Sequence, residues 1–319
     1  MPVPALELDD LRVANADGMA ILHGVSLCVA PGEVLGLVGE SGCGKSITGA
    51  TAMGMLPPGL RLHSGEVTIC GGRITDLDET ALAGVRGRRI ALIPQDATAS
   101  LNPTRTVGWH LREGLRRHRG LASRQAAQGA LDLLEQVGLT PPEKWLSAYP
   151  HQLSGGMNQR VAIARALTGQ PDVLIADEPT TALDVTMQAQ ILELLTGLAQ
   201  SGGLALLFVT HDLGVVAQIA DRVAVMYCGR IVEAAPVADF FRQPRHPYSA
   251  GLLASIPELD RRSHVAPLPG AVPPPGALPA GCAFHPRCKR ALPACWEERP
   301  ELNQLGQGQV ACFAVQVPA

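Results

Sequence analysis

The sequence has few aromatic residues, no long apolar run and no excess of charge of either sign. Aromatic residues make up 3% and hydrophobic residues 46% of the 319 residues, so a core has to be built from Ala, Val, Leu and Ile. The formal net charge of −3 gives no electrostatic reason to expect a nucleic acid as partner. No stretch approaches the roughly 18 apolar residues that a membrane-spanning helix needs. If the protein acts at a membrane, we therefore expect other chains to hold it there.

The amino-terminal residues lack the basic and apolar regions of a secretory signal peptide, so we expect a reducing compartment. Eight cysteines are unevenly placed, and four of them lie near the end with the spacings C-x5-C, C-x6-C and C-x16-C: Cys282, Cys288, Cys295 and Cys312. The tight turn of structural zinc sites is missing. Four thiolates on loops can also hold a [4Fe–4S] cluster. The cluster, a zinc ion, and free thiols or a disulfide all stay open.

Short apolar runs alternate with helical patterns, which predicts an α/β fold with a mostly parallel sheet. Strands are expected at 34–38, 173–176, 206–210 and 223–226, and a helix at 187–198. Helical patterns at 109–119 and 124–137 predict a helical subdomain, at about 97–167, inserted between strands. Composition shifts after Glu233 and proline dominates from Pro267 to Pro279. We therefore predict a domain at 1–235 and an extension at 236–319.

A glycine-rich segment after the first expected strand matches G-x-x-x-x-G-K-[ST] and reads Gly39, Glu40, Ser41, Gly42, Cys43, Gly44, Lys45, Ser46. Glycines let such a loop wrap so that its backbone N–H groups point at phosphate oxygens. Lys45 adds a positive charge for the β- and γ-phosphates, and the Ser46 hydroxyl can bind Mg²⁺. A strand before the loop and a helix after it supply the expected context. The segment predicts a nucleotide site that takes ATP with Mg²⁺.

A second acidic position follows the apolar strand Val173-Leu-Ile-Ala, which ends in Asp177 and Glu178. We expect Asp177 to reach the Mg²⁺ shell and Glu178 to orient or polarise the attacking water. A solvated acidic turn is the alternative for this segment alone. A complete phosphate loop in the same chain favours the catalytic interpretation.

The segment Leu153–Arg160 places Ser154, Gly155 and Gly156 just before an apolar helical run. Ser154 can cap that helix, and the N–H groups of the two glycines then form an anion site at its beginning. A chain with a phosphate loop does not need another for the same phosphate. We therefore expect this site to serve the nucleotide of a second ATPase chain.

Leu153–Arg160 resembles the signature motif of ABC ATPases, and the rest of that family's motifs are present in the family's order along the chain. Gln95 resembles the Q-loop glutamine that touches Mg²⁺ and water, Thr181-Ala-Leu-Asp184 the D-loop, and His211 the switch histidine that contacts the γ-phosphate. The resemblance implies a RecA-like P-loop NTPase core with an inserted helical subdomain and amino-terminal antiparallel strands. It also implies a head-to-tail dimer with two ATPs between the chains. Ala182 belongs to this D-loop.

Three further segments resemble the ATPase subunits of peptide and nickel importers: Ser100–Pro103, His246-Pro-Tyr248 with Ile256-Pro257, and Gly281–Cys288. This resemblance covers essentially the whole chain. It implies as partners two transmembrane permeases, a second and non-identical ATPase, and a periplasmic or lipoprotein solute-binding protein. It places the chain, as a peripheral subunit, on the cytoplasmic face of the inner membrane. Some members of the group carry a [4Fe–4S] cluster in this tail. The resemblance therefore implies such a cluster at Cys282, Cys288, Cys295 and Cys312, with a zinc ion, and free thiols or a disulfide, as the alternatives.

The substrate class is open, because the transported molecule never touches this chain. Peptides are favoured, with nickel or a metal-chelating opine as the alternative. A soluble ABC ATPase of DNA repair or the ribosome usually shows a long coiled coil or tandem domains, and neither is visible. Intact Glu178 and His211 argue against a regulatory module that does not hydrolyse ATP. The family's adenine-stacking aromatic has no counterpart in Leu11–Asp17, so no residue is assigned to that role.

Overall fold

The computed structural model describes residues 3–181, 183–256 and 268–316. The sequence motifs include three residues outside these ranges: Ala182, Pro257 and Pro267. By its internal contacts the chain divides into two compact units. The first unit is mainly Thr68–Phe208 together with Cys28–Glu33. The second unit combines Glu7–Leu27 and Val34–Val67 with the chain from Val209 onwards.

The first unit contains a buried parallel pair of strands, β6 (Ile90–Ile93) and β7 (Val173–Asp177). Ile90 lies opposite Val173 in this pair, and the first four residues of β7 are buried. Strand β8 (Ala205–Thr210), which begins in this unit, is the next strand after β7 and is buried throughout. Such continuous apolar runs are typical of parallel strands that are covered on both faces. The strands expected at 173–176 and 206–210 are confirmed.

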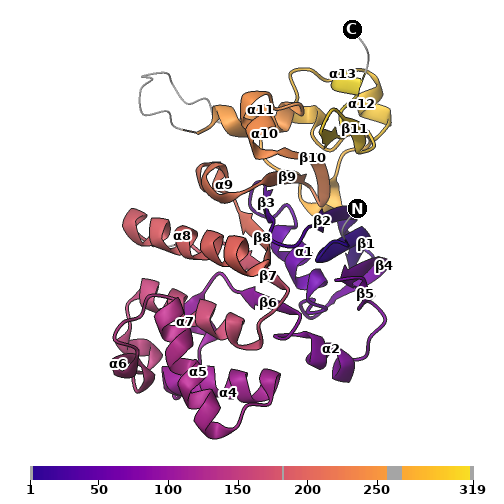
Figure 1. Cartoon of the computed structure of the whole chain (residues 1–319). Coiled ribbons are helices and arrows are strands. Elements are labelled where there is room, and N and C mark those ends of the chain that lie inside the picture. Colours follow the sequence, from indigo (N-terminus) through magenta and orange to yellow (C-terminus); the bar gives the residue numbers. More distant parts are fainter. Residues whose placement is uncertain (1–2, 182, 257–267, 317–319) are drawn as a thin grey trace. The chain divides into compact units, whose positions relative to one another are not determined.

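The helices of the first unit are α2 (Glu79–Val85), α3 (Ala97–Ser100), α4 (Val107–Arg119), α5 (Ser123–Gln136), α6 (Pro142–Leu146), α7 (Gly155–Ala166) and α8 (Val185–Gly202). Helices α4 to α7 pack against one another (Figure 1). Helix α4 begins at a Thr106 cap, whose hydroxyl accepts the Trp109 N–H at 3.2 Å. It ends at Gly120, whose φ of 65° is the left-handed conformation that closes many helices. The helices expected near 109–119, 124–137 and 187–198 are confirmed.

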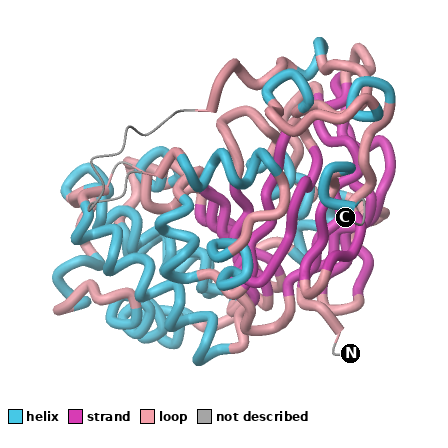
Figure 2. The backbone as a smooth tube through the Cα atoms, turned by 90° about the horizontal axis from the view of Figure 1, so that it is seen from above, coloured by secondary structure: helices cyan, strands magenta, loops and turns pink. Residues whose placement is uncertain are grey.

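The second unit is built on β3 (Val34–Val38), which is buried at every position and pairs in parallel with β9 (Arg222–Tyr227). β9 turns back into the antiparallel strand β10 (Arg230–Pro236). The chain returns much later to add two short strands beyond β10, namely β12 (Gly308–Val310) and β11 (Asn303–Leu305). Figure 2 draws all strands of the chain in magenta. Glu233 of β10 lies opposite Val310. The extension therefore pairs directly with the sheet edge, and the division at residue 236 stays a prediction.

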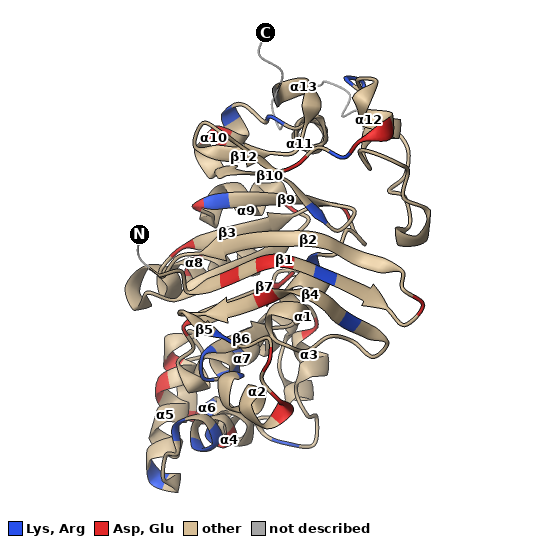
Figure 3. Ribbon diagram, turned by 90° about the vertical axis from the view of Figure 1, so that its right-hand side faces the viewer, with Lys and Arg blue, Asp and Glu red and all other residues tan. Residues whose placement is uncertain are grey.

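Antiparallel strands open the chain, as expected. β1 (Leu6–Asn15) and β2 (Ala20–Val29) form a hairpin, and β4 (Leu60–Ile69) lies on the other side of β1. Most outward positions of β1 are charged, and Figure 3 shows both signs of charge along β1 and β4. A two-residue strand, β5 (Gly72–Arg73), pairs with the end of β4. The helices of the second unit are α1 (Lys45–Ala52), α9 (Leu213–Ile219), α10 (Val237–Arg242), α11 (Pro247–Ala254), α12 (Ala294–Glu297) and α13 (Phe313–Gln316).

The buried core is largely aliphatic, as the composition predicts, but three of the few aromatic rings gather in the second unit. Tyr227 of β9 lies 4.6 Å from Tyr248 of α11 between ring centroids, and Phe284 lies 5.4 Å from both. This aromatic cluster joins the extension to the sheet. Within the described ranges, no helix combines the length and the apolar character needed to cross a membrane.

Candidate functional site

The phosphate loop runs from the end of β3 to the start of α1, in the strand–loop–helix context that the sequence predicts. A Cβ atom at Gly39 would lie 2.2 Å from the Met226 carbonyl oxygen, so the backbone passes too close for any side chain. Gly44 has a φ of 109°, which lets the chain turn directly into α1 at Lys45. At the beginning of any α-helix, the first N–H groups have no acceptor within the helix itself. This is the geometry of an anion site at a helix beginning.

Lys45 places its charge inside this loop. The residue is 6% exposed, and its ammonium donates to the carbonyl oxygens of Gly39 at 2.8 Å and Glu40 at 3.2 Å. Burial raises the pKa of the neighbouring Cys43 thiol, which therefore stays neutral. Lys45 is thus the loop's concentrated positive charge, where the sequence predicts phosphates.

Glu40, in the middle of the loop, is held by residues of the extension. Its carboxylate accepts two hydrogen bonds from the guanidinium of Arg287, at 2.8 and 3.0 Å. Its backbone N–H donates to the Tyr248 hydroxyl at 2.9 Å. The hydrogen bonds to Glu40 raise the pKa of Arg287 above its usual range. Sequence reasoning assigned no role to Arg287 or Tyr248, although both lie in segments that resemble importer ATPases.

The predicted carboxylate and glutamine come together in the first unit. Gln95 follows β6 and Glu178 follows β7, and these parallel strands end at the same sheet edge. The Gln95 amide donates to the Glu178 carboxylate at 3.3 Å, and the Thr181 hydroxyl donates to the same oxygen at 3.0 Å. Glu178 has a φ of 47°, which costs a non-glycine residue energy and recurs at functional sites. Asp177 is the last residue of β7.

The contact between Thr181 and Glu178 was not predicted from the sequence, although a hydroxyl three residues after the carboxylate could have suggested it.

His211 lies in the second unit, immediately after β8, and is exposed. The next residue, Asp212, caps α9 by accepting the N–H groups of Gly214 and Val215. The described geometry is compatible with a histidine presented to a ligand, and its role stays a prediction.

Ser154 caps α7 as expected, because its hydroxyl accepts the Met157 N–H at 3.3 Å. Gly155 and Gly156 form the first turn, where helical N–H groups lack intrahelical partners. A Cβ at Gly156 would lie 2.1 Å from the Met187 methyl group, so this turn packs closely on α8. Asp184 caps α8 by accepting the Met187 N–H at 2.9 Å. The signature and D-loop segments are therefore neighbours within the first unit.

The four cysteines of the extension are free thiols in this structure, as are the other four. Burial raises the pKa of Cys282 to about 11 and also raises the pKa values of Cys288 and Cys312. Among the described residues, no group of three or more His, Cys, Asp or Glu side chains is arranged to hold a metal ion. As placed, the thiols do not fit a zinc ion or an iron–sulfur cluster. The metal prediction has no support from this geometry.

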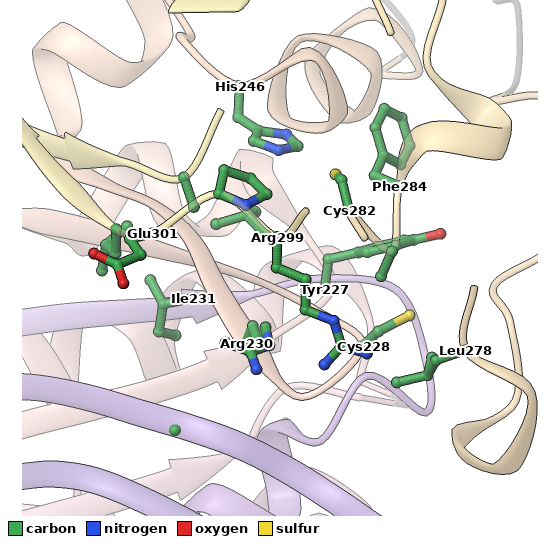
Figure 4. A pocket seen from close by; sticks show the side chains of 16 residues that line it. Tyr227, Cys228, Arg230, Ile231, His246, Leu278, Cys282, Phe284, Arg299 and Glu301 are labelled. Carbon is green, nitrogen blue, oxygen red and sulfur yellow. The ribbon is translucent and has the colours of Figure 1, made fainter. Parts of the chain in front are cut away.

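A cavity of about 310 Å³ lies inside the second unit, between β9–β10 and the extension. Figure 4 shows Tyr227, His246, Cys282 and the arginines Arg230 and Arg299 around it. None of the residues predicted for the ATP site lines this cavity. The cavity is lined mainly by residues of β9, of β10 and of the extension.

Comparison with known proteins decides the family. Residues 22–181 match the family model described as ABC transporter, and residues 232–295 match the one described as oligopeptide/dipeptide transporter, C-terminal region. The chain belongs to the family of ABC transporter ATP-binding proteins. This ABC ATPase has the α/β fold expected from its motifs, and the resemblance of its extension to the oligopeptide and dipeptide branch is confirmed.

Relatives match this ABC ATPase over most of its length. The oligopeptide transport ATP-binding protein AppD of Bacillus subtilis is 44% identical over 314 residues, covering 97% of this chain and 96% of that protein. The dipeptide transport ATP-binding protein DppD of the same organism is 46% identical over 276 residues, covering 86% and 82%. The dimeric structure of the ATP-binding cassette MJ0796, in a post-hydrolysis state with ADP and Pi, matches with a TM-score of 0.64 and 29% identity, covering 73% of this chain and 98% of that chain.

Proposed function

We propose that this ATPase powers an importer of dipeptides or oligopeptides, by coupling ATP binding and hydrolysis to uptake through partner permeases. The observation that carries the proposal is the match of residues 232–295 to the carboxy-terminal region of oligopeptide and dipeptide transporters. AppD and DppD, which are named for peptide transport, support it. Neither relative is named for nickel or for a soluble role, so these alternatives are not favoured.

In this proposal the phosphate loop and Lys45 hold the β- and γ-phosphates. The hydroxyl of Ser46, the amide oxygen of Gln95 and the carboxylate of Asp177 are hard oxygen donors, the type that Mg²⁺ prefers. Bound Mg²⁺ supplies positive charge against the phosphate oxygens during transfer. His211 contacts the γ-phosphate.

Glu178 is proposed to orient the water that attacks the γ-phosphate. Its carboxylate is held by Gln95 and Thr181, and its left-handed backbone fixes the direction from which it leaves β7. A preorganised carboxylate loses little freedom when the reaction begins. Gln95 is thereby a positioning residue for Glu178 as well as a Mg²⁺ donor.

We propose a head-to-tail dimer with a second, non-identical ATPase. The dimeric state named for MJ0796 supports such an arrangement. Ser154, Gly155 and Gly156 would contact the nucleotide that the partner's loop holds, and Asp184 would lie near the same junction. Two permeases anchor the pair at the cytoplasmic face of the membrane, and a solute-binding protein delivers the peptide.

The substitution Glu178→Gln tests the catalytic assignment. It removes the base but keeps the shape, so we expect ATP binding to persist and hydrolysis to fall at least about a hundredfold. Glu193→Gln, an exposed substitution on α8, is the matched control and should hydrolyse ATP normally. Hydrolysis at the normal rate in Glu178→Gln would show that another residue is the catalytic carboxylate.

Uptake in cells tests the substrate class. Replacing the chain by its Lys45→Ala variant should abolish uptake of labelled dipeptides and tripeptides and leave nickel uptake unchanged. Loss of nickel uptake with normal peptide uptake would refute the peptide assignment and support the nickel alternative.

The cysteines Cys282, Cys288, Cys295 and Cys312 carry a separate proposal, that they bind a [4Fe–4S] cluster. The observation in its favour is that they lie within one short segment, where the Cys282 N–H donates to the Cys295 carbonyl at 2.9 Å. Binding would require deprotonation and rearrangement of buried thiols. If the cluster is bound, anaerobically purified protein should be brown and absorb light at about 400 nm. A colourless preparation with stoichiometric zinc contradicts the cluster.

A further inference from the structure

The phosphate loop is tied to the extension at Glu40. The Glu40 carbonyl faces inward, accepting from the Lys45 ammonium at 3.2 Å and from the Cys43 N–H at 3.3 Å. Its carboxylate and its N–H face the extension and bind Arg287 and Tyr248. One residue of the loop therefore has every polar group of its backbone and side chain engaged. A shift of either extension residue must move the peptide that also positions Lys45.

Arg287 is built into the extension more firmly than a surface arginine. Its side chain is 4% exposed, whereas that of Glu40 is 30% exposed. Its Nε donates to the Pro269 carbonyl at 2.8 Å and one Nη reaches the Tyr227 hydroxyl at 3.3 Å. Its guanidinium also lies 5.8 Å from the ring centroids of both Tyr227 and Phe284. These contacts, with the extension (Pro269 and Phe284) and with Tyr227 of β9, hold the guanidinium of Arg287 in place, so Glu40 adapts to Arg287.

The negative charge of Glu40 lies in the phosphate loop, and the guanidinium of Arg287 neutralises it. A carboxylate in a loop that binds phosphates repels the anion. The bidentate guanidinium neutralises that carboxylate in the planar geometry that arginine matches best. Without Arg287, the loop would carry an unpaired negative charge five residues before Lys45.

We propose that Arg287 and Tyr248 of the extension are positioning residues for the phosphate loop, so that nucleotide affinity depends on the Arg287–Glu40 pair. The proposal rests on the proposed role of Gly39–Ser46 as the ATP loop. It gives the extension a function in the ATPase cycle: it holds the loop in shape and removes a charge that opposes phosphate. Neither residue is expected to touch the nucleotide.

The test measures binding of MgADP, which is not hydrolysed, to the full chain by calorimetry. Arg287→Gln leaves the Glu40 carboxylate without its guanidinium partner. We expect the Kd of this variant for MgADP to rise about tenfold or more. The double variant Glu40→Gln/Arg287→Gln removes both charges and should recover most of the lost affinity. Arg290→Gln, an exposed arginine three residues away, is the matched control and should bind normally.

Two further variants separate positioning from stability. Arg287→Lys keeps the charge but loses the fork, and should show an intermediate Kd; it decides the case if Arg287→Gln does not fold. Tyr248→Phe removes only the acceptor for the Glu40 N–H, and should raise Kd by a smaller factor. Folded variants at Arg287 that melt earlier but bind MgADP with normal affinity would overturn the proposal. Failure of the unmodified chain to bind MgADP would instead refute the proposed function.

Discussion

His246 provides a test of how the extension is held, because it is a buried titratable group at the joint between sheet and extension. It is 2% exposed and caps α11, where its Nδ1 accepts the Tyr248 N–H at 3.0 Å. Burial lowers its pKa from 6.5 to about 4, and a hydrogen bond with the Ala311 backbone partly opposes this shift. The neutral imidazole is therefore the form that the folded chain requires. Protonation should destabilise the second unit.

The pKa of His246 in the unfolded chain, 6.5, and in the folded chain, about 4, determine the direction and the size of the change in stability with pH. Folding favours the neutral ring, so the stabilisation is complete above the unfolded pKa of 6.5 and is lost as pH falls from 6.5 towards about 4. In that window the unfolded chain takes up a proton that the folded chain rejects. Between pH 7.5 and pH 5 the loss is about 2 kcal/mol for this residue. Below about pH 4 both states are protonated and the dependence ends.

Urea unfolding at pH 7.5 and pH 5 measures this loss. His246→Gln cannot take up the proton, so its stability should fall by about 2 kcal/mol less than that of the unmodified chain over the same interval. His63→Gln, an exposed histidine of β4, is the control and should behave like the unmodified chain. His23, whose pKa burial also lowers to about 4, titrates in the same window and contributes equally to all three proteins. Equal losses in the unmodified chain and His246→Gln would refute the reasoning.

Two substitutions test the loop and the signature segment. Gly39→Ala would bring a methyl group to 2.2 Å from the Met226 carbonyl, so we expect MgADP binding by calorimetry to be lost, and normal affinity would contradict the close approach. Ser154→Ala removes the cap of α7 and should lower the free energy of unfolding by about 1 kcal/mol in urea. If the signature role is right, ATP-dependent association with the partner ATPase should weaken as well; unchanged association measured by light scattering would argue against that role.

Much of the fold could be predicted because its central strands are buried on both faces. Val34–Val38 and the first four residues of β7, Val173 to Ala176, are therefore continuous apolar runs, which are easily recognised in a sequence. The short edge strands Asn303–Leu305 and Gly308–Val310 could not be predicted in this way. They are half polar, and β12 pairs with β10, which lies far away in the sequence. The pairing partner, rather than the local pattern, makes them strands.

Some contacts of the candidate site could also be predicted from the sequence, and others could not. Gln95 and Glu178 meet because they follow neighbouring parallel strands, so their contact is a consequence of topology that motif order anticipates. Arg287 and Glu40 are 247 residues apart, and nothing in the local pattern around either residue indicates the other. The cysteine spacing, in contrast, indicated a metal that the described side chains are not arranged to hold.

The distance between Glu40 and Arg287 along the chain also concerns synthesis. A ribosome adds on the order of 5–20 residues per second, so the phosphate loop emerges ten seconds or more before the arginine that holds it. Strand β12, which covers the edge of β10, is made later still. Through that interval the nascent chain has an unsupported loop and an open strand edge, the kind of surface that chaperones shield. A nascent chain that does not yet include Arg287 should therefore bind nucleotide more weakly than the chain in which Arg287 holds Glu40.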